Sequence, residues 1–64
     1  MLPLAPLKRV AKKAGAERVS DEAVKEIRDI LEEIAEDLAR DAATAAKHAG
    51  RVTVKAEDIR LVAR

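Results

Sequence analysis

The sequence predicts an all-α fold with three helices, one long and two short. Residues 21–49 contain neither glycine nor proline, and their apolar residues recur at helical spacing. A shorter amphipathic segment lies on each side of this stretch. The chain of 64 residues has no aromatic residue and no cysteine, so its core is small and is not stapled by a disulfide.

The first helix is expected within residues 2–15. Pro3 and Pro6 suit its start and first turn, because the amide hydrogens of these positions are not needed for helical hydrogen bonds. Gly15 is expected to end it. An apolar stripe lies on one side and basic residues lie on the other. The stripe consists of Leu7, Val10, Ala11 and Ala14, and the basic residues are Lys8, Arg9, Lys12 and Lys13.

Residues 16–19 are too few for more than a connector or a short β-bridge. Ser20 follows as the candidate N-cap of the long helix, and Arg18 is expected to be exposed. Free backbone N–H groups and the positive end of the helix dipole make such a helix start a potential phosphate site. The basic residues alone leave a second interpretation open, a solvated face on a packing helix.

The long helix has consistent start and stop signals. Asp21 and Glu22 lie at its positive end, Lys47 and His48 lie in its last turn, and Gly50 follows. At about 1.5 Å per residue it would be roughly 43 Å long, which exceeds the width of a globule of this size. One chain therefore cannot bury it. Its apolar positions are Val24, Ile27, Leu31, Ile34, Leu38, Ala42, Ala45 and Ala49.

Burial makes a second chain close to obligatory. A domain of this size buries only about 60% of its unfolded surface. Each fully buried aliphatic side chain contributes about 1.5–3 kcal/mol, against an entropy loss on the order of 1.5 kcal/mol per residue. We therefore expect a homodimer. Its core is expected to contain the bulky side chains of the long helix, Val24, Ile27, Leu31, Ile34 and Leu38.

The last part of the chain predicts a β-favouring loop and a short helix. The loop is residues 51–54 and the helix is residues 55–64. Glu57 and Asp58 fall in the first turn of that helix, where negative charge is favoured. The residues expected to face inward are Ile59 and Val62, with Leu61 and Ala63 as further candidates.

The net charge of +1 conceals regions of opposite sign. Residues 1–18 carry a net charge of +4, residues 19–41 carry −6, and residues 42–64 carry +3. The field near a cluster of charges decides an encounter, so the two basic ends can bind a polyanion although the whole chain is nearly neutral.

Several classes of function find no support in the sequence. No nucleophile–base set, phosphate loop or metal cluster is present, so we expect no enzyme, no cofactor and no small-molecule substrate. His48 is the only histidine, and we expect it to cap a helix or contact a neighbouring chain rather than bind a metal. The lack of cysteine fits a reducing cytoplasm. Neither an export signal nor a membrane span is recognisable, so no membrane partner is expected.

Three segments resemble an archaeal histone: AGAERVSDEA at 14–23, ILEEIAEDLA at 30–39 and KHAGRVTVKAEDIRLVAR at 47–64. The opening LPLAPLKR is similar to the first helix of that family, so the resemblance covers essentially the whole chain. It implies a single histone-fold domain over residues 1–64 and a handshake homodimer with crossed long helices. Each loop then pairs with the other loop of the partner through short parallel β-bridges, Arg18-Val19 beside Thr53-Val54.

The resemblance also implies that the dimer wraps double-stranded DNA into nucleosome-like structures with little sequence specificity. By position, Arg18 would enter the minor groove and Thr53 would steady it. The implied DNA-binding residues are Arg9, Lys12, Arg18, Val19, Ser20, Asp21, Thr53, Val54 and Lys55, with Lys8, Lys13 and Lys47 as lesser contributors. The implied partners are DNA, a second copy of the chain and other histones, and the implied location is the chromosome in the cytoplasm.

Two further groups are implied by the same resemblance. Arg51 and Asp58 match a family pair that ties the second loop to the third helix, so we interpret Arg51 as structural rather than DNA-contacting. Contacts between stacked dimers would involve Ala45, His48, Asp58 and Leu61.

The sequence also departs from the family. Val52 stands where a basic residue is usual, Ala45 stands where a larger aliphatic is usual, and the basic and aromatic end of relatives is absent after Arg64. These differences weaken the expectation of tight binding and of long stacked filaments more than that of the fold. The alternative function is a helical assembly module with a protein partner. The absence of aromatic residues leaves open a natural or a reconstructed origin.

Overall fold

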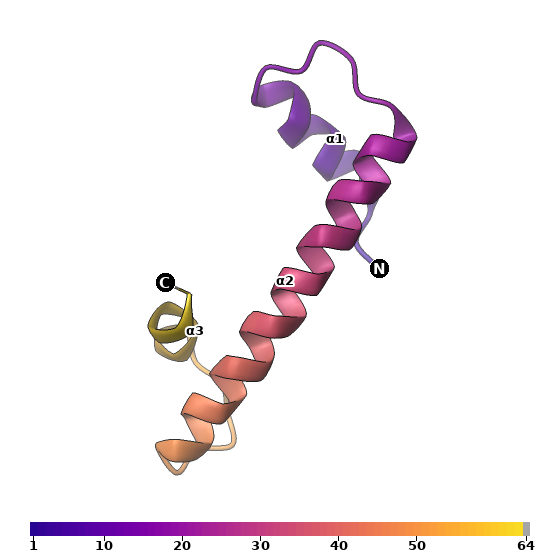
Figure 1. Ribbon diagram of the computed structural model, residues 1–64. Coiled ribbons are helices and arrows are strands. Elements are labelled where there is room, and N and C mark those ends of the chain that lie inside the picture. Colours follow the sequence, from indigo (N-terminus) through magenta and orange to yellow (C-terminus); the bar gives the residue numbers. More distant parts are fainter. Residues whose placement is uncertain (64) are drawn as a thin grey trace. The chain divides into compact units, whose positions relative to one another are not determined.

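The computed structural model describes residues 1–63 and consists of three α-helices (Figure 1). They are α1 (Leu4–Lys13), α2 (Asp21–His48) and α3 (Ala56–Val62). Within the described residues no strand is formed, which confirms the all-α prediction. The chain divides into a first unit, Met1–Glu33, and a second unit, Ile34–Arg64, and α2 contributes residues to both.

Local signals at both ends define α1. Pro3 is its N-cap, with extended backbone angles, and Pro6 lies in the first turn. Gly15 has φ +118°, a conformation that L side chains rarely adopt, and it follows the last turn as expected. The prediction of an apolar stripe is wrong in one respect. Val10 is 63% exposed, and the half-buried side of α1 consists of Leu4, Leu7, Lys8 and Ala11.

One face of α2 in the first unit lies against the N-terminal segment. Val24 is completely buried, and Arg28 and Glu32 follow at steps of four residues as half-buried side chains. The backbone N–H of Leu2 donates to Glu32 Oε2 at 3.0 Å, which places this segment beside the same face. Val24, expected in the dimer core, is therefore already covered within its own chain.

The second unit packs small residues of α2 near α3. Ala42 and Ala46 are 0% and 1% exposed, and side chains of this size allow close helix approach. In α3, Ile59 and Val62 are half-buried as predicted, whereas Leu61 is 58% exposed and Ala63 is also exposed. The third helix was expected to continue to the end of the chain. It ends at Val62, and Arg64 lies outside the described residues.

A second apolar stripe of α2 is not covered within the chain. Ile27, Leu31 and Ile34 are 37%, 39% and 51% exposed, and Ile30, beside them, is 50% exposed. Leu38, the remaining residue of the expected dimer core, is half-buried. Exposed aliphatic side chains at helical spacing are typical of a helix that packs against a further partner.

Across residues 1–63, no helix is both long enough and apolar enough to cross a membrane.

Candidate nucleic-acid interface

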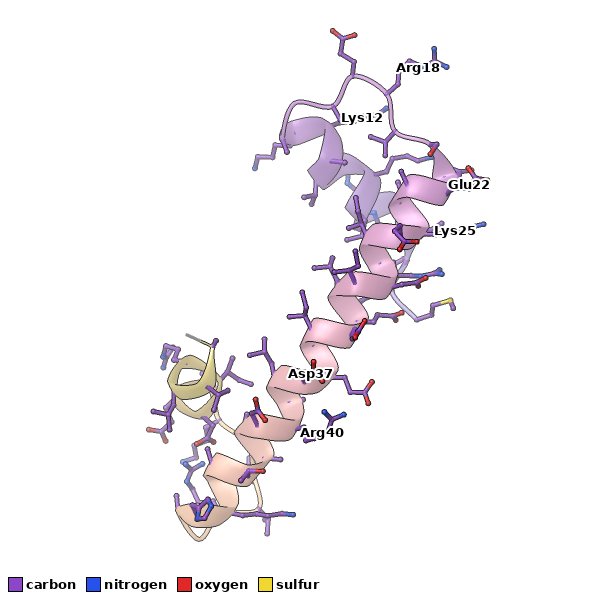
Figure 2. The ribbon with its side chains drawn as sticks, viewed as in Figure 1. Lys12, Arg18, Glu22, Lys25, Asp37 and Arg40 are labelled. Carbon is purple, nitrogen blue, oxygen red and sulfur yellow. The ribbon has the colours of Figure 1, made fainter. Side chains whose placement is uncertain are left out.

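The exposed basic side chains of the first unit lie on α1 and on the connector to α2. Arg9, Lys12 and Lys13 are exposed on α1, and none of them forms an ion pair with any residue among 1–63. Lys12 and Lys13 lie in the last turn, where the helix dipole favours positive charge. Arg18 lies on the connector, is exposed, and extends away from the helices of this unit (Figure 2). These guanidinium and ammonium groups are accessible to an anion.

Lys8 differs from its basic neighbours because it has an acidic partner. Its Nζ donates a hydrogen bond to Asp21 Oδ1 at 2.7 Å, and the two side chains are 39% and 66% exposed. The hydrogen bond from Lys8 lowers the pKa of Asp21, with a further contribution from the charges of Lys8 and Lys25. The carboxylate of Asp21 is therefore ionised at neutral pH, and the ammonium of Lys8 is held beside it.

Ser20 caps the start of α2, as the sequence predicts. Its Oγ accepts a hydrogen bond from the backbone N–H of Ala23 at 3.1 Å, and its carbonyl accepts one from Val24 at 3.1 Å. The hydroxyl hydrogen of Ser20 remains able to donate. The backbone N–H groups of Asp21 and Glu22 belong to the first turn, which has no intrahelical acceptors. The half-buried Val19 precedes the cap.

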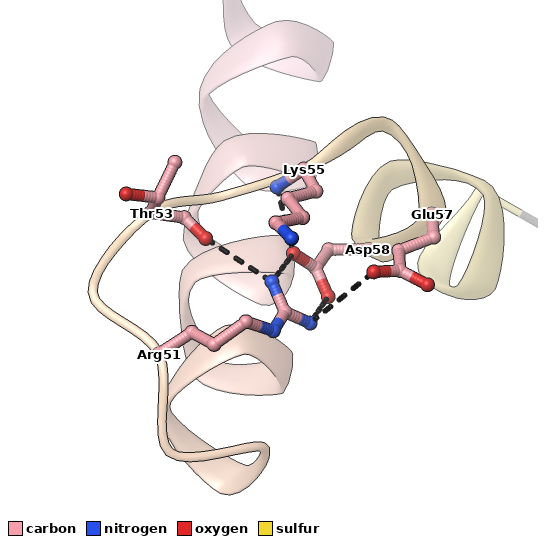
Figure 3. Close-up of polar contacts among 5 residues, drawn as sticks. All are labelled: Arg51, Thr53, Lys55, Glu57 and Asp58. Atoms are coloured by element: carbon pink, nitrogen blue, oxygen red, sulfur yellow. Dashed lines mark hydrogen bonds and ion pairs between the residues drawn. The ribbon is translucent and has the colours of Figure 1, made fainter.

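In the second unit, Arg51 organises the loop before α3 (Figure 3). Its Nη1 and Nη2 donate to the two carboxylate oxygens of Asp58 at 2.9 and 2.8 Å, a bidentate pair. Nη1 also donates to the carbonyl of Thr53 at 3.2 Å. Arg51 Nη2 lies 3.8 Å from Glu57 Oε1 as well. With these partners, the guanidinium fixes the loop.

Asp58 ties the same loop to the first turn of α3. It is 3% exposed, and its Oδ2 accepts a hydrogen bond from the backbone N–H of Lys55 at 2.7 Å. The hydrogen bonds from Arg51 and Lys55 lower its pKa to about 2, the former being the larger cause, and the pKa of Arg51 is raised in turn. Asp58 therefore holds structure within its own chain, whereas its predicted role between stacked dimers stays a prediction.

The remaining residues of this loop present less charge. Val52 is 100% exposed, Val54 is 41% exposed, and the side chain of Thr53 is exposed. Lys55 is exposed and forms no ion pair in the described part of the chain. The loop between α2 and α3 thus offers Lys55 as an available cation, while Arg51 is occupied by carboxylates.

The other residues singled out in the sequence lie at the end of α2. Lys47 and His48 occupy its last turn and are exposed, and Ala45 is half-buried. Residues 1–63 contain no pocket and no group of three His, Cys, Asp or Glu side chains suited to a metal ion.

Residues 1–62 match the family described as histone-like transcription factor (CBF/NF-Y) and archaeal histone. The chain belongs to this family. It is 55% identical over 60 residues to the archaeal histone HAN1 of Thermococcus zilligii, covering 94% of this chain and 90% of that protein. It is 52% identical over 63 residues to probable archaeal histone 3 of Methanocaldococcus jannaschii, covering 98% of this chain and 94% of that protein.

A further relative is longer. The chain is 42% identical over 60 residues to DNA-binding protein HmvA of Methanocaldococcus jannaschii, covering 94% of this chain and 62% of that protein. Membership of the family confirms the resemblance to archaeal histones, the histone fold and the expectation of a non-enzymatic protein.

Two features of this histone-fold chain were not expected from its sequence. One is the pairing of Lys8 with Asp21, residues that lie on different helices. No local signal could have revealed it, because it depends on how α1 sits against the start of α2. The other is the contact of Glu32 with the backbone of Leu2. Glu32 belongs to the acidic middle region, which suggested only a solvated side chain.

Proposed function

We propose that this chain forms a handshake homodimer that wraps and compacts double-stranded DNA with little sequence specificity. The observation that carries the proposal is a set of exposed basic side chains without acidic partners in residues 1–63, at positions where the histone resemblance implies DNA contacts. The set is Arg9, Lys12, Arg18 and Lys55. The names of the relatives, archaeal histone and DNA-binding protein, support the same function.

The uncovered stripe of α2 supports dimerisation. Ile27, Leu31 and Ile34 retain 37–51% of their exposure in the single chain. Completing the burial of each such side chain contributes on the order of 1 kcal/mol, and a symmetric interface includes every residue twice. We propose that a second copy of the chain covers this stripe, as in the handshake of the family. Residues 1–64 would then behave as one histone-fold domain, and the two loops would pair between chains.

DNA binding would be dominated by electrostatics. Each phosphate neutralised by Lys or Arg releases condensed counterions, and an arginine in a narrow minor groove adds affinity without selecting particular bases. Arg18 would supply that insertion with support from Thr53 and Val54, and Arg9, Lys12 and Lys55 would meet phosphates. The backbone from Val19 to Asp21 and the hydroxyl of Ser20 would bind a phosphate at the start of α2. Preference among sequences would follow the ease of bending.

This mechanism also gives the expected cellular location and partners. A protein that binds any accessible duplex stays with the chromosome, so in an archaeal cell it would be found at the nucleoid in the cytoplasm. The homodimer is the form that we propose, and pairing with other histones uses the same stripe of α2.

Replacing Arg18 with alanine tests the function. On the DNA-wrapping mechanism, Arg18→Ala weakens duplex binding while the mass of the free protein stays that of a dimer, because Arg18 is exposed and lies outside the apolar stripe. Arg40→Ala is the matched control, since Arg40 lies in the acidic region and is paired with Glu36 and Asp37 at 3.0 Å each. Equal DNA binding by Arg18→Ala and the wild type would support the protein-assembly alternative instead.

A further inference from the structure

We propose that Asp21 limits the DNA affinity of this protein by holding Lys8 in an ion pair, so that the two side chains act as one neutral unit. This inference rests on the proposed DNA-binding function. It makes Asp21 a residue that sets affinity, although acidic residues at the start of a helix usually serve only the helix dipole.

The contact joins two elements that bear the proposed DNA contacts. Lys8 belongs to α1, beside the exposed Arg9, and Asp21 is the first residue of α2, beside Ser20. The Nζ–Oδ1 distance of 2.7 Å is that of a strong, charge-assisted hydrogen bond. The hydrogen bond and charge of Lys8 lower the pKa of Asp21, so the carboxylate keeps its charge throughout the neutral pH range. Lys8 is thus occupied where its basic neighbours are not.

The pair is nevertheless open to exchange. Both side chains are partly exposed, at 39% and 66%, and water screens the attraction between such groups. The bidentate pair of Arg51 and Asp58 provides the contrast, because Asp58 is 3% exposed and also accepts from a backbone N–H. Asp21 has no such second structural role among residues 1–63, and the cap of α2 is made by Ser20. Its charge can therefore be removed without loss of the cap.

The carboxylate opposes phosphate binding in two ways. A phosphate that approaches Lys8 must displace Asp21 from the ammonium, and the displaced carboxylate then repels the same phosphate. Removing the charge of Asp21 ends both effects and makes Lys8 available. Each additional phosphate contact steepens the dependence of log K on log salt by about 0.9.

The experiment is a salt series of binding to a duplex of about 60 base pairs, long enough for wrapping, with three variants compared with the wild type. Asp21→Asn should bind more tightly, with a slope steeper by about 0.9 per chain or 1.8 per dimer. The double variant Lys8→Met with Asp21→Asn should lose this gain. Asp37→Asn removes the same charge from the partner of Arg40, which lies 3.0 Å away, and should leave the slope unchanged (Figure 2).

Helix content and dimer mass are recorded for every variant. If Asp21→Asn loses helicity, Asp21→Ser replaces it, because serine is also tolerated at helix starts. A wild type that binds with a steep slope, beside an Asp21→Asn variant with the same slope, overturns this inference and leaves the proposed function intact. A folded wild type that does not bind the duplex at low salt overturns both.

Discussion

Replacing Val52 with lysine should add a phosphate contact to the loop between α2 and α3. Val52 is 100% exposed, so its side chain contributes nothing to the core. The backbone around it is held by Arg51, which donates to the carbonyl of Thr53 and to Asp58. A lysine at position 52 would therefore project from an ordered loop beside Lys55, at a position where the family usually has a basic residue.

The expected effect follows from the number of added contacts. One lysine per chain gives two per dimer, and at about 0.9 per phosphate the slope of log K against log salt should steepen by about 1.8. Between 50 and 200 mM salt, a fourfold change, the ratio of variant to wild-type affinity should then fall about twelvefold. Tighter binding by the variant is accordingly clearest at low salt.

A salt series on a duplex of fixed length measures this change. Val52→Thr is the matched control, because threonine is also β-branched and adds no charge, and substitutions at exposed positions alter stability by about 0.5 kcal/mol or less. Parallel salt plots for Val52→Lys and the wild type would refute the reasoning, since they would mean that this loop does not face phosphates.

Two further predictions concern stability and assembly. The pKa of Asp58 is lowered from 3.8 to about 2 in the folded chain, so its stabilising effect is present above about pH 4 and is lost as the pH falls towards 2. Acid unfolding followed by circular dichroism should show this loss, and Asp58→Asn should remove that part of the pH dependence while lowering stability at neutral pH. Ile34, 51% exposed on the uncovered stripe, should be essential for dimerisation. Ile34→Glu should dissociate the dimer in sedimentation measurements, and a variant that remains fully dimeric would contradict the assignment of that interface.

The helices were predictable because their ends are marked by local signals. Pro3, Gly15, Ser20 and Gly50 act through their own backbone preferences or through hydrogen bonds to residues three positions away, as the contact of Ser20 with Ala23 shows. The β-favouring residues 51–54 are a weaker signal. In the described chain they form a loop, held by the side chain of Arg51, and the expected pairing with a partner's loop stays a prediction.

The sides of the helices were harder to predict than their ends. Helical spacing shows that residues share a face, but it does not show which element covers that face. Val24 satisfies the spacing of the expected dimer core and is nevertheless buried within its own unit. Val10 satisfies the spacing of the α1 stripe and is exposed. The pairing of Lys8 with Asp21 likewise depends on tertiary packing.

The resemblance carried the assignment of DNA contacts further than charge alone. Composition separated basic ends from an acidic middle, and this favoured a polyanion as partner. It did not distinguish Arg51, held by Asp58, from Arg18, which has no ion-pair partner in residues 1–63. That distinction came from matching the family's motif, and the structure supplies its physical cause, the bidentate contact with a buried carboxylate.

Binding of the wild-type protein to a duplex of about 60 base pairs across a salt series, with the mass of the free and bound protein recorded, tests the central claim most directly. With eight to ten phosphate contacts per dimer, log K should fall against log salt with a slope of about −7 to −9, and dimers should add in steps as the duplex lengthens. A stable dimer that leaves the duplex unbound even at low salt would contradict the claim.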